Sequence, residues 1–114
     1  MATRVPDFDT DTGPMLGSAS LLTFGSSTTL VLSGEFDAGT SAGLLEALGT
    51  ACAAAEDLVV DMTGVTFLDG RALRYIERAA WVLDKRAATL RIAHPPRVVL
   101  RLARAAGATH LLRA

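Results

Sequence analysis

Cysteine and long apolar runs are scarce in this sequence, and each scarcity excludes a class of protein. The single cysteine, Cys52, excludes an intramolecular disulfide and leaves no cysteine cluster that could hold a metal. No run of residues approaches the roughly 18 apolar positions of a membrane-spanning helix. The first fifteen residues are acidic and lack the apolar core of a secretion signal. We therefore expect one cytoplasmic domain of 114 residues, long enough for an apolar core.

Basic residues are almost missing from the first 70 positions. Arg4 is the only one there, against ten acidic residues, whereas residues 71–114 carry ten basic and two acidic residues. The two parts have formal net charges of −9 and +8, which together give the −1 of the chain. Such a split is typical of two oppositely charged faces of one globule, of a charge-steered partner site, or of a nucleic-acid surface. Direct nucleic-acid binding is not expected, since only Tyr75 and Trp81 accompany the arginines as stacking side chains.

The motifs of common catalytic and metal sites are also missing. There is no Walker loop, and no glycine fingerprint of dinucleotide binding follows a strand. Asp69 is a lone carboxylate without a second acid, base or nucleophile in its motif. Neither His94 nor His110 has a Cys, His or carboxylate at metal-ligand spacing. We therefore predict that the chain is not an enzyme and has no metal site and no cofactor.

Short apolar segments in the first half predict a hairpin followed by a helix. Strands are expected over 19–24 and 29–32, around the turn-forming residues 25–27. Thr40 or Ser41 is placed to cap the helix that follows. The core positions of this helix recur at helical spacing and are Leu44, Leu48, Ala51 and Ala55. Cys52 lies beside that stripe and is expected to pack as a small apolar side chain.

The central stretch, LVVDMTGVTFLDGRALRYI, carries the strongest structural signal. Leu58–Val60 is a β-branched apolar run, typical of a strand that is buried on both faces. Thr63 and Gly64 interrupt the pattern, and 65–68 resume it as a second extended piece. A helical pattern follows from Arg71. A strand that turns directly into a helix places exposed backbone N–H groups and the positive end of the helix dipole at the carboxyl edge of a sheet.

The helix expected over 71–86 has two distinct sides. The side that is predicted to face the sheet consists of Leu73, Ile76, Ala80 and Leu83. The opposite side gathers Arg71, Arg74, Arg78 and Lys85, with Trp81 on its border. Basic residues on the outer face of an amphipathic helix are usually only solvated, but an exposed Trp beside arginines has the composition of an interface hot spot. A partner-binding face and a solvated face therefore both stay open at this point.

The last part of the chain predicts a strand over 88–93 and a helix that starts after Pro95 and Pro96. The core positions of this helix are predicted to be Val99, Leu102, Ala103 and Ala106, and Gly107 is expected to end it. Residues 109–112 are expected to form a last short strand or a docking tail. The predicted class is α/β: a single domain in which a mixed sheet of about four or five strands is packed by helices, with a hairpin followed by α-β-α-β-α.

Two strings in the sequence resemble the STAS domain of bacterial anti-sigma factor antagonists. They are DMTGVTFLDGRAL and, upstream of it, GEFDAGTSAGLLEAL, where the family typically has DLSGVTFLDSSGL after GELD. The resemblance covers about Leu21 to Leu112 and implies a STAS domain over 18–114, after a mobile acidic tail over 1–17. It also implies a function, because in this family the dephosphorylated domain captures a kinase-type anti-sigma factor and phosphorylation releases it.

The chain departs from the family at the phosphorylation motif. Where the family has Asp-Ser-Ser-Gly, this sequence has Asp69, Gly70, Arg71 and Ala72, so that Arg71 takes the place of the phosphorylated serine. No hydroxyl is present at position 70 or 71, and no regulatory phosphorylation is expected at 69–72. Arg71 either leaves the domain permanently able to bind, with its guanidinium pairing a carboxylate or phosphate, or it blocks the usual kinase partner and leaves another client.

The resemblance places a partner-binding surface on the loop before the helix and on the helix itself. Its expected members are Asp69, Arg71, Arg74, Arg78 and Trp81, although Asp69 could equally be only a helix cap. The expected partner is an anti-sigma factor, a histidine-kinase-like ATPase. The alternatives are a STAS accessory subunit of a membrane lipid or solute transport system and a ligand-sensing STAS module. The sequence leaves the oligomeric state open.

Overall fold

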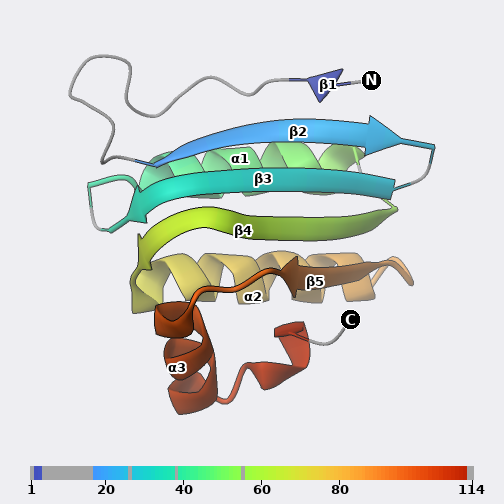
Figure 1. Cartoon of the computed structure of the whole chain (residues 1–114). Coiled ribbons are helices and arrows are strands. Elements are labelled where there is room, and N and C mark those ends of the chain that lie inside the picture. The colour runs from blue at the N-terminus through green and yellow to red at the C-terminus, as the bar shows by residue number, and fades with distance from the viewer. Residues whose placement is uncertain (1, 4–16, 26, 38, 55, 113–114) are drawn as a thin grey trace.

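The computed structural model describes residues 2–3, 17–25, 27–37, 39–54 and 56–112. Its centre is a five-stranded sheet in the order β1-β2-β3-β4-β5, in which β1, β2 and β3 are antiparallel and β3, β4 and β5 are parallel (Figure 1). The strands are β1 Ala2–Thr3, β2 Ser18–Phe24, β3 Ser27–Phe36, β4 Asp57–Leu68 and β5 Thr89–Ala93. The helices are α1 Ser41–Ala54, α2 Gly70–Asp84, α3 Arg97–Ala106 and the 3-10 helix η1 Thr109–Leu112. The predicted α/β class and element order are confirmed.

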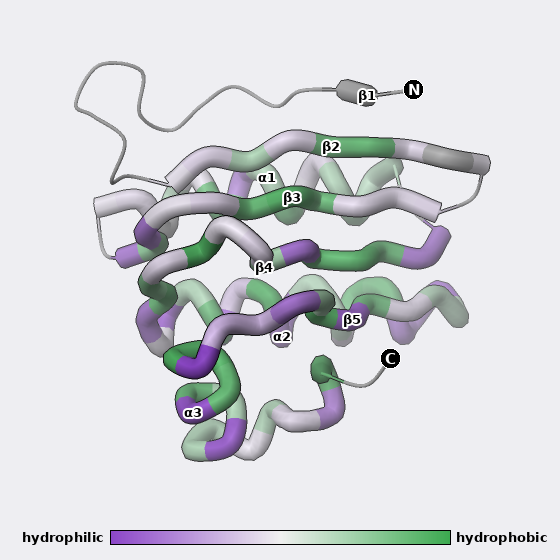
Figure 2. Tube along the Cα trace, in the orientation of Figure 1, coloured by the Kyte–Doolittle hydropathy of each residue, from purple (hydrophilic) through white to green (hydrophobic). Residues whose placement is uncertain are grey.

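Two helices cover one face of the sheet. α1 and α2 run side by side behind the strands in Figure 1, because each connects two neighbouring parallel strands and parallel strands need a crossover. Leu30 and Leu32 of β3 and Val60 and Met62 of β4 are fully buried against this helix layer. Figure 2 shows the apolar positions concentrated in these central strands. α3 and η1 lie at the β5 edge (Figure 1).

The hairpin of β2 and β3 is longer than the sequence predicted. Ser18 pairs with Ser33 and Phe24 with Ser27, so the turn between the strands holds Gly25 at a φ of +62°, which glycine adopts without strain. Two residues of the expected tail, Ala2 and Thr3, pair with β2. Residues 4–16 lie outside the described part of the chain, so the boundary between tail and domain stays a prediction.

The start of β2 is held close to the end of β3. A Cβ atom on Gly17 would lie 2.5 Å from Cε1 of Phe36, which is fully buried. Glycine is therefore the only residue that fits at position 17 without moving the aromatic ring of Phe36. This contact helps to place the end of β3, where the candidate site begins.

The sequence prediction was wrong in dividing β4 into two pieces. β4 is one strand of 12 residues, and Thr63 and Gly64 lie where its register with β3 shifts. A Cβ on Gly64 would lie 2.8 Å from the Cβ of Ser33, so the glycine permits a bulge at which the two strands approach closely. The prediction that Leu58–Val60 is buried on both faces was also wrong, because Val59 on the open face of the sheet is only half-buried.

The helix core stripes are largely as predicted, with errors near the end of the chain. Leu44, Leu48 and Ala51 of α1 are buried, while Ala55 lies outside the described residues. On α2, Leu73, Ile76 and Leu83 are buried, Ala80 is half-buried, and Ala72 and Ala79 also face the core. On α3, Val99 and Ala103 are buried and Leu102 packs against the core.

One prediction near the end of the chain was wrong, and another left two alternatives of which one is observed. Ala106, predicted as a core residue, is exposed because it belongs to the last turn of α3, just before the chain leaves the helix at Gly107. Residues 109–112 form a 3-10 helix and not a strand, with a hydrogen bond from the Leu111 N–H to the Ala108 carbonyl. They pack beside β5 with Leu111 buried, as the docking-tail alternative expected. The left-handed φ of +71° at Gly107 confirms the predicted helix end.

Candidate partner-binding surface

Asp69 holds the turn between β4 and α2. Its backbone N–H donates a hydrogen bond of 3.0 Å to the carbonyl of Phe36 at the end of β3. Its carboxylate Oδ1 accepts a hydrogen bond of 2.8 Å from the backbone N–H of Ala72, and its own carbonyl accepts one from Leu73. Asp69 is therefore the N-cap of α2 and joins the helix to the neighbouring strand. The cap role that the sequence left open for Asp69 is observed.

The loop between β3 and α1 lies at the same edge of the sheet and is fixed by its own hydrogen bonds. The Thr40 hydroxyl accepts from the Asp37 N–H and donates to the Glu35 carbonyl, and Asp37 Oδ1 accepts from the Gly39 N–H. Thr40 stands at the N-cap position, where its carbonyl accepts from Leu44. Its hydroxyl does not cap the helix, however, because it turns back to the strand end.

The residues after Asp69 point in different directions. Ala72 is fully buried, whereas Gly70 and Arg71 are exposed. A Cβ on Gly70 would have no atom within 4 Å, so this position could accept a side chain. The structure thus places an exposed arginine, Arg71, in the first turn of α2.

The outer side of α2 is a continuous exposed surface, which we call the arginine face and define as Arg71, Arg74, Arg78 and Trp81. All four side chains are exposed, and Trp81 is 60% exposed. The Lys85 ammonium lies 4.4 Å from the centre of the Trp81 ring, a cation–π contact that helps to orient the ring. Side chains of this surface line a hollow of about 710 Å³. The structure thus brings together the α2 residues that the sequence proposed for partner binding, while their role stays a prediction.

The arginines of the arginine face form no ion pairs within the described chain, although Glu77 lines the same hollow. In that part of the chain no arginine forms an ion pair. Arg71 also lies in the first turn of α2, where a positive charge opposes the helix dipole at a cost of about 0.3–1 kcal/mol. This position is therefore unfavourable for the isolated domain and favourable for contact with an anionic group.

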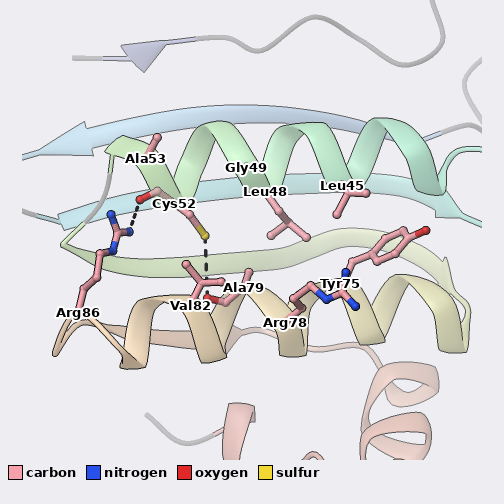
Figure 3. A pocket seen from close by; sticks show the side chains of 10 residues that line it. All are labelled: Leu45, Leu48, Gly49, Cys52, Ala53, Tyr75, Arg78, Ala79, Val82 and Arg86. Atoms are coloured by element: carbon pink, nitrogen blue, oxygen red, sulfur yellow. Dashed lines mark hydrogen bonds between the residues drawn. The ribbon is translucent and has the colours of Figure 1, made fainter.

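A second hollow, of about 360 Å³, lies between α1 and α2 and was missed by the sequence analysis (Figure 3). Cys52 borders it and is otherwise buried, with its Sγ 4.0 Å from the carbonyl oxygen of Ala79. Burial raises the pKa of the Cys52 thiol, and the positive charge of Arg86 offsets part of this effect. Arg86 also donates a hydrogen bond to the Cys52 carbonyl near the end of α1. In the sequence, the feature that could have indicated this hollow is Gly49, a glycine inside a helix.

The described residues supply little else for chemistry. No group of three or more His, Cys, Asp or Glu residues among them could hold a metal ion. His94 and His110 are both exposed. None of the described helices is both long and apolar enough to cross a membrane.

Comparison with known proteins identifies the family. A family model described as "Mlab, STAS domain" matches residues 22–113. A crystal structure of an anti-sigma factor antagonist from Mycobacterium paratuberculosis is similar, with 21% identity and a TM-score of 0.77 over 88% of this chain and 86% of the other. The anti-sigma factor antagonist SpoIIAA in its unphosphorylated form has 16% identity and a TM-score of 0.71 over 84% and 86%.

The phosphorylated form of SpoIIAA, a Bacillus cell fate determinant, is also similar, with 15% identity and a TM-score of 0.66 over 84% of this chain and 89% of the other. At such identities the three structures show a shared fold and no more. Comparison with curated protein sequences finds no match. The family model covers most of the chain, and the predicted STAS fold is confirmed. The chain belongs to the STAS domain family.

Proposed function

We propose that the chain is a regulatory binding module of the anti-sigma factor antagonist type, which captures a histidine-kinase-like anti-sigma factor through the arginine face and the adjoining residues Asp69 and Gly70. The carrying observation is that this surface holds exposed arginines without ion pairs next to a largely exposed Trp81. An interface core enriched in Arg and Trp is typical of binding hot spots. The shared fold with anti-sigma factor antagonists supports this choice of partner class.

The module lacks the phosphorylation switch at this loop. Residues 69–72 carry no hydroxyl, and the exposed Arg71 stands at the position of the phosphorylated serine. A phosphoserine adds about −1.5 to −2 charges, whereas Arg71 fixes one positive charge at the same place. The partner surface opposite Arg71 is therefore expected to carry a carboxylate or phosphate.

The test compares three baits in a pull-down from native lysate: wild type, Arg71→Asp and Arg101→Asp. Arg101 is an exposed arginine of α3, so its variant makes the same charge change away from α2. An aspartate in the first turn of α2 should stabilise the helix by about 0.3–1 kcal/mol, so loss of binding by Arg71→Asp cannot come from unfolding. We expect wild type and Arg101→Asp to capture a histidine-kinase-like ATPase and Arg71→Asp to release it.

Two outcomes would count against the proposal. Equal capture by all three baits would place position 71 outside the contact. Capture of no such kinase by wild type would remove the antagonist function and leave only the fold.

In a companion experiment, Arg71→Ser restores a hydroxyl, and incubation with the captured kinase and ATP should add one phosphate at residue 71 of the variant and none at 69–72 of wild type. Phosphate within 69–72 of the wild type would refute the missing switch.

A second candidate is an accessory subunit of a membrane lipid or solute transport system. The absence of a hydroxyl at residues 69–72 favours it, because a permanent subunit needs no phosphorylation there, and the matching family description, "Mlab, STAS domain", does not name an antagonist. The same pull-down separates the two candidates, because this function predicts capture of an ABC-type ATPase instead of a kinase. The arginine face would be the contact surface in either case.

A further inference from the structure

The hollow between α1 and α2 is a groove along the seam of two neighbouring helices. It opens on the side of the helix layer away from the sheet (Figure 3). α1 contributes Leu45, Gly49 and Ala53, and α2 contributes Tyr75, Ala79 and Val82, so each helix presents positions spaced by three or four residues. Such spacing produces a straight channel parallel to both helices. We call this feature the helical groove.

The side chains along the sides of the helical groove are larger than those on its floor. Leu45 and Val82, on opposite sides, are 43% and 40% exposed, which is unusual for large apolar side chains on the same hollow. Gly49, Ala53 and Ala79 leave the space between these sides open. Small residues between two apolar ridges allow the backbone of a third helix to approach closely. The shape therefore fits a helix better than an extended chain.

Gly49 is not required by the fold of this chain. A Cβ at this position would meet no atom within 4 Å, and the residue lies inside α1, without a positive φ. A glycine in a helix interior is destabilising by roughly 0.5–1 kcal/mol relative to alanine. The domain therefore carries an unfavourable residue at a position that helps to keep the helical groove open. An occupant that contacts the α1 backbone accounts for this choice.

The charge around the helical groove indicates what the occupant carries. Arg78 lines the α2 side, forms no ion pair among the described residues, and belongs to the arginine face as well. A second copy of this chain would present the same groove, whose described lining holds Arg78 and Arg86 and no acidic residue. Like charges across an interface are unfavourable. A partner with acidic residues beside an apolar ridge is complementary, whereas a second copy is not.

We propose that the helical groove docks an acidic amphipathic helix of the partner protein. Apolar side chains of that helix at i, i+3 or i+4, and i+7 lie between Leu45 and Val82, and its carboxylates lie on the α2 side, facing Arg78. The presence of a partner rests on the proposed function. The docking mode extends that function, because the helical groove and the arginine face share Arg78 and form one continuous surface.

Two synthetic helical peptides test the docking mode on the full chain. Both have the same ridge of leucines, and one has glutamates along its flank where the other has lysines. Binding is measured by titration of the isotopically labelled protein, with amide NMR signals as the readout. We expect the acidic peptide to shift signals over 45–53 and 75–82 and to bind at least about tenfold more tightly than the lysine peptide.

Two matched variants locate the contact. Gly49→Leu fills the helical groove, whereas Thr50→Leu adds the same side chain at the next exposed position, outside it. We expect Gly49→Leu to weaken binding of the acidic peptide by at least about tenfold, and Thr50→Leu to leave it within about twofold of wild type. Equal losses in the two variants, equal binding of the two peptides, or no saturable shift at about 1 mM peptide would overturn the proposal. Self-association of the wild type that Gly49→Leu abolishes would also overturn it, by assigning the helical groove to a second copy.

This test fails independently of the test of the proposed function. If Arg71→Asp releases a captured kinase but the acidic peptide does not bind, the proposed function stands and the docking mode falls. If the peptide binds as expected but wild type captures no kinase, the docking mode stands and the kinase assignment falls. The Gly49→Leu bait in the lysate experiment then shows whether the natural partner uses the same groove: its capture should drop with that of Arg71→Asp.

Discussion

Replacement of Asp69 separates the two roles that its carboxylate can have, in the fold and in partner binding. Asp69→Ala removes the hydrogen bond that Oδ1 accepts from the Ala72 N–H, and it also removes a negative charge from the N-terminus of α2. Asp69→Asn keeps a side-chain oxygen at the cap and removes only the charge. The backbone hydrogen bond from residue 69 to the Phe36 carbonyl is kept in both variants.

The two variants should differ clearly in stability. Loss of an N-cap costs about 1 kcal/mol, and loss of a favourable charge at a helix N-terminus costs about 0.3–1 kcal/mol. We therefore expect Asp69→Ala to lower the free energy of unfolding by about 1.5 kcal/mol and Asp69→Asn by about 0.5 kcal/mol. At roughly 4 °C per kcal/mol for a domain of this size, the midpoint temperatures should fall by about 6 °C and about 2 °C.

Urea unfolding followed by circular dichroism measures this difference, with an unchanged dependence on urea as the sign that only stability has changed. An Asp69→Asn variant as unstable as Asp69→Ala would show that the charge, not the cap hydrogen bond, stabilises α2. An Asp69→Ala variant as stable as wild type would refute the cap role. The same Asn variant tests partner binding: if Asp69 acts only through the loop, Asp69→Asn captures the partner as well as wild type does.

Three further predictions follow from side chains outside the arginine face. Thr28 is fully buried and its hydroxyl has no hydrogen-bond partner among the described residues, so Thr28→Val should raise the free energy of unfolding by about 1 kcal/mol in urea unfolding. Burial raises the pKa of the Cys52 thiol, so iodoacetamide should label Cys52 slowly at pH 7.5. Labelling should be slower still in Arg86→Met, which lacks the offsetting positive charge. Labelling of the folded protein as fast as in urea would contradict the burial. Desolvation alone would raise the pKa of Asp61, but hydrogen bonds from the Thr63 side chain and backbone, together with nearby His94, lower it. Because the pKa of Asp61 is lower in the folded than in the unfolded state, where it is about 3.9, the ionised carboxylate stabilises the fold above that pH. This stabilisation is lost as pH falls through the folded pKa, so Asp61→Asn should flatten the pH dependence of the free energy of unfolding below about pH 4.

The arginine face could be predicted from the sequence because its geometry is local. The apolar spacing of Leu73, Ile76 and Leu83 fixes which side of α2 meets the sheet, and that fixes the opposite side. Every member of the face is exposed, as the helical wheel requires. The STAS fold was predicted from the resemblance of two sequence strings to that family, and the motif around Asp69 in one of them includes a strand end, a cap and a helix start in consecutive residues.

Features that depend on two distant segments could not be predicted. The bulge in β4 requires Gly64 to meet Ser33, which lies on another strand, so from the sequence alone the glycine indicated a break. The Thr40 hydroxyl was expected to be a cap but bonds to the Glu35 carbonyl instead. The helical groove depends on how α1 and α2 lie side by side, which no periodicity within either helix specifies. Only Gly49 left a trace of it in the sequence.

The sign of the charge at residue 71 has a consequence for regulation. A phosphorylatable serine lets the start of α2 alternate between neutral and strongly negative, so a kinase can control binding through that one residue. Arg71 instead places a positive charge in the first turn of α2. Under the proposed function, we therefore expect binding to be controlled by the amount of partner or by a competitor for the same surface. Arg78 lines both the helical groove and the hollow of the arginine face, so under the proposed docking mode a competitor that occupies the groove would also block Arg78.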